Sequence, residues 1–143
     1  MNLGILLDTG FIFALKDEND PYHLQAIKLF KNINWDDLSP VITNNLVINE
    51  VLTLAVYRSL GNKKILEALK NLVWGTEKFF QVLEVPFENY EAVLKILIQY
   101  ISPKKLLSFV DASLIYSAKL LKYNKIISFD SHFDGILTRF LNN

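Results

Sequence analysis

The chain has 143 residues, and its 15 lysine and arginine residues balance 15 aspartate and glutamate residues, so the formal net charge is zero. Hydrophobic residues make up 51% and charged residues 21%, which excludes a disordered chain and predicts a single compact domain over residues 1–143. The absence of cysteine excludes disulfides and thiolate metal sites, and the two histidines argue against a multi-histidine zinc site.

The first predicted elements alternate between apolar runs and helices. Residues 3–7 are almost continuously apolar, which is typical of a central strand in a parallel sheet, and a short helix is predicted over residues 10–15. Asp20 followed by Pro21 predicts that the next helix begins there and ends near residue 32, with Asp20 as its N-cap. A second strand is predicted over residues 40–43.

The remaining elements continue this alternation. Helices are predicted over residues 45–60, 63–74, 88–101 and from 108 onward, and strands over residues 79–85 and 125–129. The tail over residues 132–141 fits either a short helix or an edge strand. The alternation predicts an α/β fold with a mostly parallel sheet. No apolar run approaches the roughly 20 residues of a membrane helix, and residues 3–7 are too short for a signal peptide, so we expect a soluble cytoplasmic protein.

Two aspartates follow predicted strands. Asp8 comes directly after the first apolar run, and Asp130 follows the strand over residues 125–129. Sites in open parallel sheets form at the carboxyl ends of strands, where both side chains are expected. Each of them, taken alone, could instead be a turn residue or a helix N-cap.

Two further acids lie on apolar helix faces. Glu50 has Leu46, Val47 and Leu54 as its neighbours on the helix surface, so its carboxylate needs a partner unless it reaches water at the margin of this face. Asp111 lies in the first turn of its helix, on the face that points inward. It could also be an acid that the helix dipole favours.

Four carboxylates gathered in one pocket would repel one another, and a hard divalent cation would relieve that repulsion. Oxygen ligands favour Mg²⁺ or Mn²⁺ over zinc. The sequence contains no glycine-rich phosphate loop, dinucleotide-binding fingerprint or serine nucleophile elbow that would favour another chemistry.

The order of these acids resembles the PIN-domain ribonucleases, especially the small VapC-type toxins of prokaryotic toxin–antitoxin pairs. The matching segments span nearly the whole chain: Leu6-Leu7-Asp8-Thr9, Asn49-Glu50-Val51, Ser108-Phe109-Val110-Asp111-Ala112 and Ile127-Ser128-Phe129-Asp130-Ser131-His132-Phe133.

The resemblance implies a three-layer α/β/α sandwich and Mg²⁺- or Mn²⁺-dependent endonucleolytic cleavage of single-stranded or loop RNA, leaving a 5′-phosphate and a 3′-hydroxyl. It also implies a small antitoxin partner and a homodimer. The implied metal-binding and catalytic set is Asp8, Glu50, Asp111 and Asp130. Thr9 and Ser128 are implied as supporting hydroxyls.

Two features depart from the family pattern. Ser128 stands where the family often has threonine, and the segment between Glu50 and Asp111 is long, with an extra helical hairpin. His132 is interpreted as a surface or packing residue and left out of the site, and Asp134 is expected at the surface. A housekeeping RNA-processing nuclease without an antitoxin and a catalytically silent binding module remain alternatives. Arg58 and two lysine pairs, Lys63-Lys64 and Lys104-Lys105, are further candidates for phosphate contacts.

Overall fold

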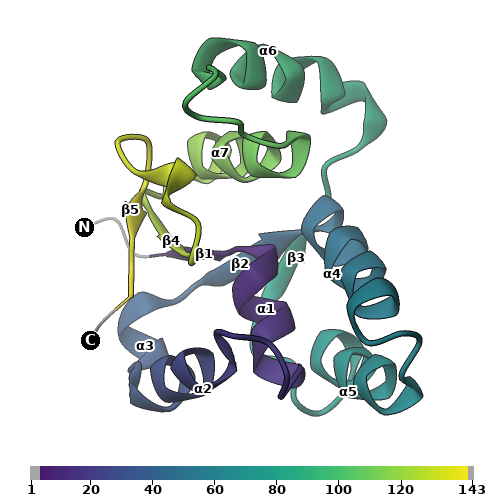
Figure 1. Cartoon of the computed structure of the whole chain (residues 1–143). Helices are drawn as coiled ribbons and strands as arrows, with labels where there is room; N and C mark the ends of the chain where they lie inside the picture. Colours follow the sequence, from purple (N-terminus) through teal and green to yellow (C-terminus); the bar gives the residue numbers. More distant parts are fainter. Residues whose placement is uncertain (1–3, 142–143) are drawn as a thin grey trace.

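A five-stranded parallel sheet forms the centre of the computed structural model, which describes residues 4–141 (Figure 1). Its strands are β1 (Ile5–Leu7), β2 (Val41–Asn44), β3 (Gln81–Leu83), β4 (Lys125–Ile127) and β5 (Thr138–Arg139). The spatial order is β3-β2-β1-β4-β5, so the first strand lies in the middle. Leu6 is paired with Ile42 of β2 on one side and with Ile126 of β4 on the other.

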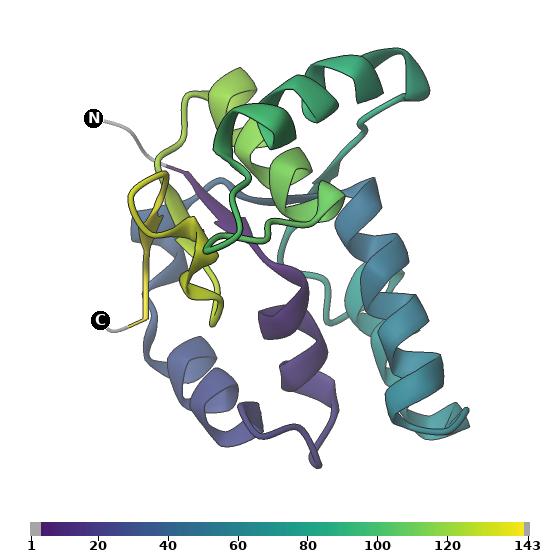
Figure 2. The ribbon, with the colours of Figure 1, turned by 45° about the horizontal axis from the view of Figure 1, so that its top comes forward.

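Helices cover both faces of the sheet. They are α1 (Thr9–Lys16), α2 (His23–Asn32), α3 (Trp35–Leu38), α4 (Asn45–Arg58), α5 (Lys63–Trp74), α6 (Tyr90–Tyr100) and α7 (Phe109–Leu121). In Figures 1 and 2, α6 and α7 lie on one side of the sheet and α1 and α2 on the other, with α4 and α5 beside the β2–β3 end. This is the α/β/α arrangement that the sequence predicts. Within residues 4–141, no helix has the length and apolar character needed to cross a membrane.

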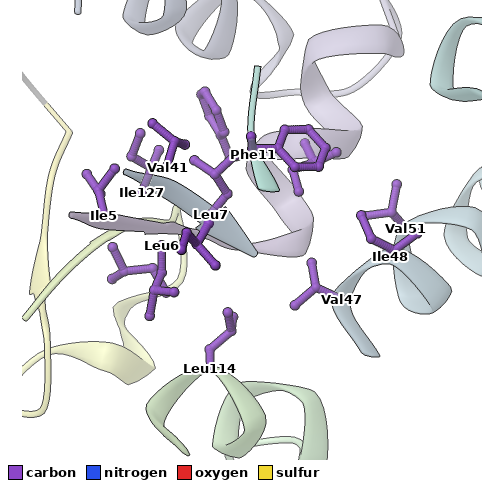
Figure 3. Packing of buried hydrophobic residues seen from close by; sticks show 14 of the residues in the cluster. Ile5, Leu6, Leu7, Phe11, Val41, Val47, Ile48, Val51, Leu114 and Ile127 are labelled. Carbon is purple, nitrogen blue, oxygen red and sulfur yellow. The ribbon is translucent and has the colours of Figure 1, made fainter. Parts of the chain in front are cut away.

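The central strand is apolar throughout because helices cover both of its faces. Ile5, Leu6 and Leu7 are all completely buried. Successive side chains of a strand point to opposite faces, so both helical layers pack on this strand. Figure 3 shows Leu114 of α7 on one side of the strands and Phe11 of α1 on the other. The packing fixes the end of β1, where Asp8 lies.

One local prediction was wrong, and one short helix was missed. The helix after Asp20 begins at His23, because the Asp20 carboxylate accepts a hydrogen bond from Tyr22 N (2.8 Å) and closes a turn that precedes the helix. The short helix α3 was not predicted. The tail, for which the sequence left a short helix and an edge strand open, contains one of each. They are a one-turn 3₁₀ helix, η2 (Ser131–Phe133), and the two-residue edge strand β5. A second 3₁₀ turn, η1 (Phe87–Asn89), precedes α6.

Candidate active site

The site lies at the carboxyl end of the central strands. Asp8 follows β1 directly, and its backbone N–H donates to the carbonyl of Ile127 at the end of β4 (3.1 Å). Asp130 lies three residues after that strand. Glu50 comes from α4, which begins immediately after β2, and Asp111 comes from the first turn of α7. The parallel topology therefore brings acids from distant parts of the chain to one edge.

The Asp8 carboxylate is buried and held by two donors. Its Oδ1 accepts from Thr9 N (2.7 Å) as the N-cap of α1, and its Oδ2 accepts from Ser128 Oγ (2.6 Å). Burial raises the pKa of Asp8 to about 7, and nearby Asp111 and Asp130 add to this increase, while the hydrogen bond from Ser128 opposes it. In the folded chain without a bound cation, the charged form of Asp8 is therefore less favoured than that of an ordinary aspartate.

Asp111 is both a helix cap and a member of the acidic group. Ser108 Oγ accepts from Asp111 N (3.0 Å), and the Asp111 carboxylate accepts from Ser108 N (2.9 Å), which completes a capping box at the start of α7. Burial raises the pKa of Asp111, and the charges of Asp130 and Glu50 raise it further, against the hydrogen bonds from Ser108. Asp111 is thus an acid at a helix terminus, as the alternative interpretation proposed, and it also lines the pocket.

Asp130 is half-buried beside a histidine. Its backbone N–H donates to Ser128 Oγ (3.0 Å), so one hydroxyl links Asp130 to Asp8. Its Oδ1 accepts from His132 N (2.8 Å) and lies 3.2 Å from His132 Nδ1. One potential ligand atom from each of Asp111, Asp130 and His132 lies within 4.8 Å of the other two. His132, which the sequence interpretation left out of the site as a surface or packing residue, therefore lies beside two of the acids.

Glu50 is partly buried, as Asp130 is, whereas Asp8 and Asp111 are buried. It lines the same pocket as Asp8, Asp111 and Asp130, and its charge acts on Asp111, but it is not part of the compact group with His132. Its carboxylate thus reaches the pocket from the margin of its apolar helix face.

The pocket has a volume of about 420 Å³. Beside the acids, its wall contains residues that the sequence reasoning did not assign to a site. They are Asp20, Tyr22, Leu54, Arg58 and Phe129, with smaller contributions from Gly10 and Ser131. Tyr22 lies in a turn that the sequence assigns to a helix, and no periodic pattern connects it with Phe129 more than 100 residues later. Arg58 was named among several candidates for phosphate contacts, but the sequence did not connect it with this pocket.

The donor set fits a hard divalent cation. Five acidic residues line the pocket, Asp20 and the four acids predicted from the sequence, and Mg²⁺ and Mn²⁺ prefer oxygen ligands. Thr9 also lines the pocket, and its Oγ1 is the one buried side-chain polar atom of the described chain that lacks a hydrogen-bond partner. A buried hydroxyl without a partner is costly, which is consistent with a polar ligand or an ordered water at this place.

Asp134 lies outside the pocket, as expected. Its carboxylate accepts two hydrogen bonds from Arg139, from Nε (2.7 Å) and from a terminal nitrogen (3.1 Å). The hydrogen bond from Arg139 lowers the pKa of Asp134. Asp134 thus has a cationic partner of its own at the surface.

A family model described as "PIN domain" matches residues 5–136. VapC20 from Mycobacterium tuberculosis, described as a sarcin-ricin loop cleaving toxin, has 22% identity and a TM-score of 0.79 over 97% of this chain and 100% of that chain. FitAcB from Neisseria gonorrhoeae has 19% identity and a TM-score of 0.66 over 95% and 96%.

PAE2754 from Pyrobaculum aerophilum has 22% identity and a TM-score of 0.53, with 91% of this chain and 82% of that chain covered. A search of the curated proteins found no significant match. At these identities the solved structures establish a shared fold, and the family model covers nearly all of the chain.

Proposed function

The chain belongs to the PIN-domain family, a family of nucleases, and we propose that it is a metal-dependent endoribonuclease whose residues 1–143 act as one domain. The observation that carries the proposal is the gathering of Asp8, Glu50, Asp111 and Asp130 around one pocket. Burial raises the pKa of two of these carboxylates, Asp8 and Asp111, so holding them in the charged form destabilises the fold. Residues kept at such a cost are candidates for function.

In the proposed mechanism the four acids hold Mg²⁺ or Mn²⁺. When bound, Mg²⁺ or Mn²⁺ would supply positive charge for phosphate oxygens and would lower the pKa of a water. Ser128 holds Asp8 and the backbone of Asp130 in fixed positions through its hydroxyl. Thr9 would support Asp8 through its backbone N–H (2.7 Å), and its Oγ1 is buried without a hydrogen-bond partner in the described part of the chain. A water then attacks the phosphorus in line, leaving a 5′-phosphate and a 3′-hydroxyl.

We further propose that the enzyme is the toxin of a toxin–antitoxin pair, that it acts on RNA in the cytoplasm, and that it forms a homodimer controlled by a small antitoxin. Support comes from VapC20, which is described as a toxin and is covered over 100% of its own length, with 97% of this chain. The discriminating observation is the neighbouring gene: a short open reading frame that encodes a DNA-binding protein directly upstream of this gene would support the toxin. A gene without such a neighbour favours the RNA-processing alternative.

Cleavage of single-stranded RNA tests the nuclease. The wild type is incubated with Mn²⁺ or Mg²⁺, and the products are resolved by gel electrophoresis, with EDTA added in parallel to exclude metal-independent contaminants. We expect Asp111→Asn to reduce the cleavage rate by roughly 100-fold or more, because it removes a charge on which transition-state stabilisation depends.

Asp134→Asn is the matched control, since it neutralises an exposed acid outside the pocket. We expect it to retain the wild-type rate. Equal rates for the wild type and Asp111→Asn would refute the proposed site. The absence of cleavage by folded wild-type protein on all single-stranded RNA tested would favour a binding module.

A further inference from the structure

Three aromatic rings lead from the core to the rim of the acidic pocket. Phe11 is fully buried and lies 6.3 Å from Phe129, with a 52° angle between the rings. Phe129 is stacked on Tyr22 with ring centroids 4.5 Å apart and an angle of 4°. Tyr22 is 46% exposed, and both it and Phe129 line the pocket. The series therefore ends in an open aromatic ring beside the acids.

One cation accompanies these rings. Among the residues that line the pocket, Arg58 carries the only positive charge. Its guanidinium lies over the ring of buried Phe13, 5.4 Å from the centroid, and 3.5 Å from a carboxylate oxygen of Asp20. The other oxygen of Asp20 accepts from Tyr22 N (2.8 Å), so Asp20 connects the arginine to the tyrosine.

This arrangement is poorly explained by stability alone. The pair between Arg58 and Asp20 is long at 3.5 Å, and although the Asp20 side chain is only 6% exposed, the Arg58 side chain is 53% exposed and keeps N–H donors for a further anion. The Tyr22 ring also leaves apolar area in water at the edge of the pocket. A planar guanidinium and an open aromatic face are instead the groups that bind a phosphate and a nucleobase.

We propose that Tyr22 and Arg58 form a nucleotide-binding subsite, in which an unpaired base stacks on Tyr22 and a neighbouring backbone phosphate binds Arg58. This inference rests on the proposed function, because it takes RNA as the substrate. A base within a duplex is already stacked on both sides and does not offer a free face to Tyr22. The subsite thus selects unpaired nucleotides and holds the strand against the acidic pocket.

Base stacking can be measured without cleavage. The full chain is mixed with Ca²⁺, which accepts the same oxygen ligands, and with ten-nucleotide RNAs that carry 2-aminopurine at one position at a time. We expect wild-type protein to quench the fluorescence at one or two positions. Tyr22→Ala is expected to abolish this quenching and to weaken binding roughly 5- to 100-fold, whereas Tyr22→Phe keeps both within about twofold.

Tyr57→Ala is the matched control, because Tyr57 is 74% exposed on α4 and does not line the pocket. We expect it to bind and quench like the wild type. If Tyr22→Ala unfolds, Tyr22→Leu retains apolar cover over Phe129 without an aromatic face, and the same loss of quenching is expected. A fully paired RNA of the same sequence is expected to show no position-specific quenching.

The phosphate contact is tested by salt dependence. We expect Arg58→Gln to lower the slope of log affinity against log salt by about 0.7, the value for one phosphate contact on a single strand, and Arg58→Lys to keep it. Lys95→Gln, which removes an exposed cation from α6, is expected to leave the slope unchanged.

Normal quenching by folded Tyr22→Ala, or an unchanged slope for Arg58→Gln, would overturn the subsite even if the wild type cleaves RNA. Quenching that depends on Tyr22 in a protein that cleaves no RNA would support the subsite and refute the nuclease. The two proposals can therefore fail separately.

Discussion

Asp111 carries two roles that make opposite demands on its carboxylate. As part of the capping box, it needs only an oxygen that accepts from Ser108 N, and an uncharged amide meets this need. Asp111 is also buried close to Asp130 and Glu50. Burial, and then the charges of these two neighbours, disfavour the charged carboxylate and raise the pKa of Asp111. Substitutions that keep the acceptor but remove the charge can separate the two roles.

In metal-free buffer at pH 8, we expect Asp111→Asn to melt at or above the wild-type temperature. The substitution keeps an acceptor for Ser108 N and removes both the burial of a charge, which is the main cause of the raised pKa of Asp111, and the repulsion from Asp130 and Glu50. Asp111→Ala is the contrasting variant. It loses the capping bond, which costs about 1 kcal/mol, and we expect it to melt a few degrees lower than Asp111→Asn.

Circular dichroism melts in EDTA measure both differences. A drop of several degrees for Asp111→Asn, equal to that for Asp111→Ala, would mean that the charge itself stabilises α7.

For single residues, the sequence predicts the position in the fold better than the contacts that the side chain makes there. Asp8 and Asp130 could be assigned to one edge because each follows a strand, and parallel strands end together. The stack of Tyr22 on Phe129 could not be predicted, since it joins two loops whose approach depends on the packing of α1 and α2. The position of His132 next to Asp111 depends likewise on a 3₁₀ turn that carries no periodic signal.

The helices that carry Glu50 and Asp111 are joined by one buried side chain. Asn44, at the end of β2, accepts from Val47 N (2.9 Å) and so caps α4. Its Nδ2 donates to the hydroxyls of Ser113 (3.0 Å) and Ser117 (3.1 Å) on α7. Asn44 is completely buried, so these bonds are made without competition from water. Asn44 therefore ties the start of α4 to α7 through buried hydrogen bonds.

Asn44→Ala is therefore expected to lose more stability than removal of an ordinary helix cap. We expect a loss of about 2–4 kcal/mol, from the cap of α4 and two buried hydrogen bonds. Asn62→Ala is the matched control, because Asn62 caps α5 at an exposed position with bonds to Lys64 N and Ile65 N. We expect the control to lose about 1 kcal/mol.

Urea denaturation of both variants provides the comparison. Equal losses would show that the bonds from Asn44 to α7 contribute nothing beyond the cap.

The alternation of elements was predictable because apolar periodicity differs between buried strands and amphipathic helices. The strand β1 and the helices α4 and α5 lie within the predicted ranges because their residues follow one pattern without conflict. The start of α2 was not predictable from Asp20 and Pro21, since the Asp20 side chain caps a turn instead of the helix. The tail was ambiguous because β5 has two residues, too few for any period.

For the whole molecule, the acidic pocket couples stability to pH. The pKa of Asp8 is raised by burial from 3.8 to about 7, and that of Asp111 is raised in the same direction. The folded chain therefore binds more protons than the unfolded chain between about pH 4 and pH 7, so its free energy of unfolding falls as pH rises through this window. For Asp8 the loss is at most roughly 4 kcal/mol, since one pKa unit corresponds to about 1.4 kcal/mol.

A divalent cation should reverse this dependence. Binding to the folded chain alone stabilises it by about 2.7 kcal/mol at a concentration of 100 Kd. Since Asp8 must lose its proton to bind a metal, we expect Mn²⁺ to raise the melting temperature by several degrees at pH 8 and much less at pH 5.5. In EDTA the wild type should instead melt lower at pH 8 than at pH 5.5.

Asp8→Asn is expected to flatten the difference in EDTA and to lose most of the response to Mn²⁺, while Asp134→Asn keeps both. A response to Mn²⁺ that is the same at both pH values, or that survives Asp8→Asn, would place the cation elsewhere. In EDTA the melting temperature should fall as pH rises, and the increase caused by Mn²⁺ should grow as pH rises. This combination is specific to a site in which one buried carboxylate destabilises the metal-free fold and also binds the cation.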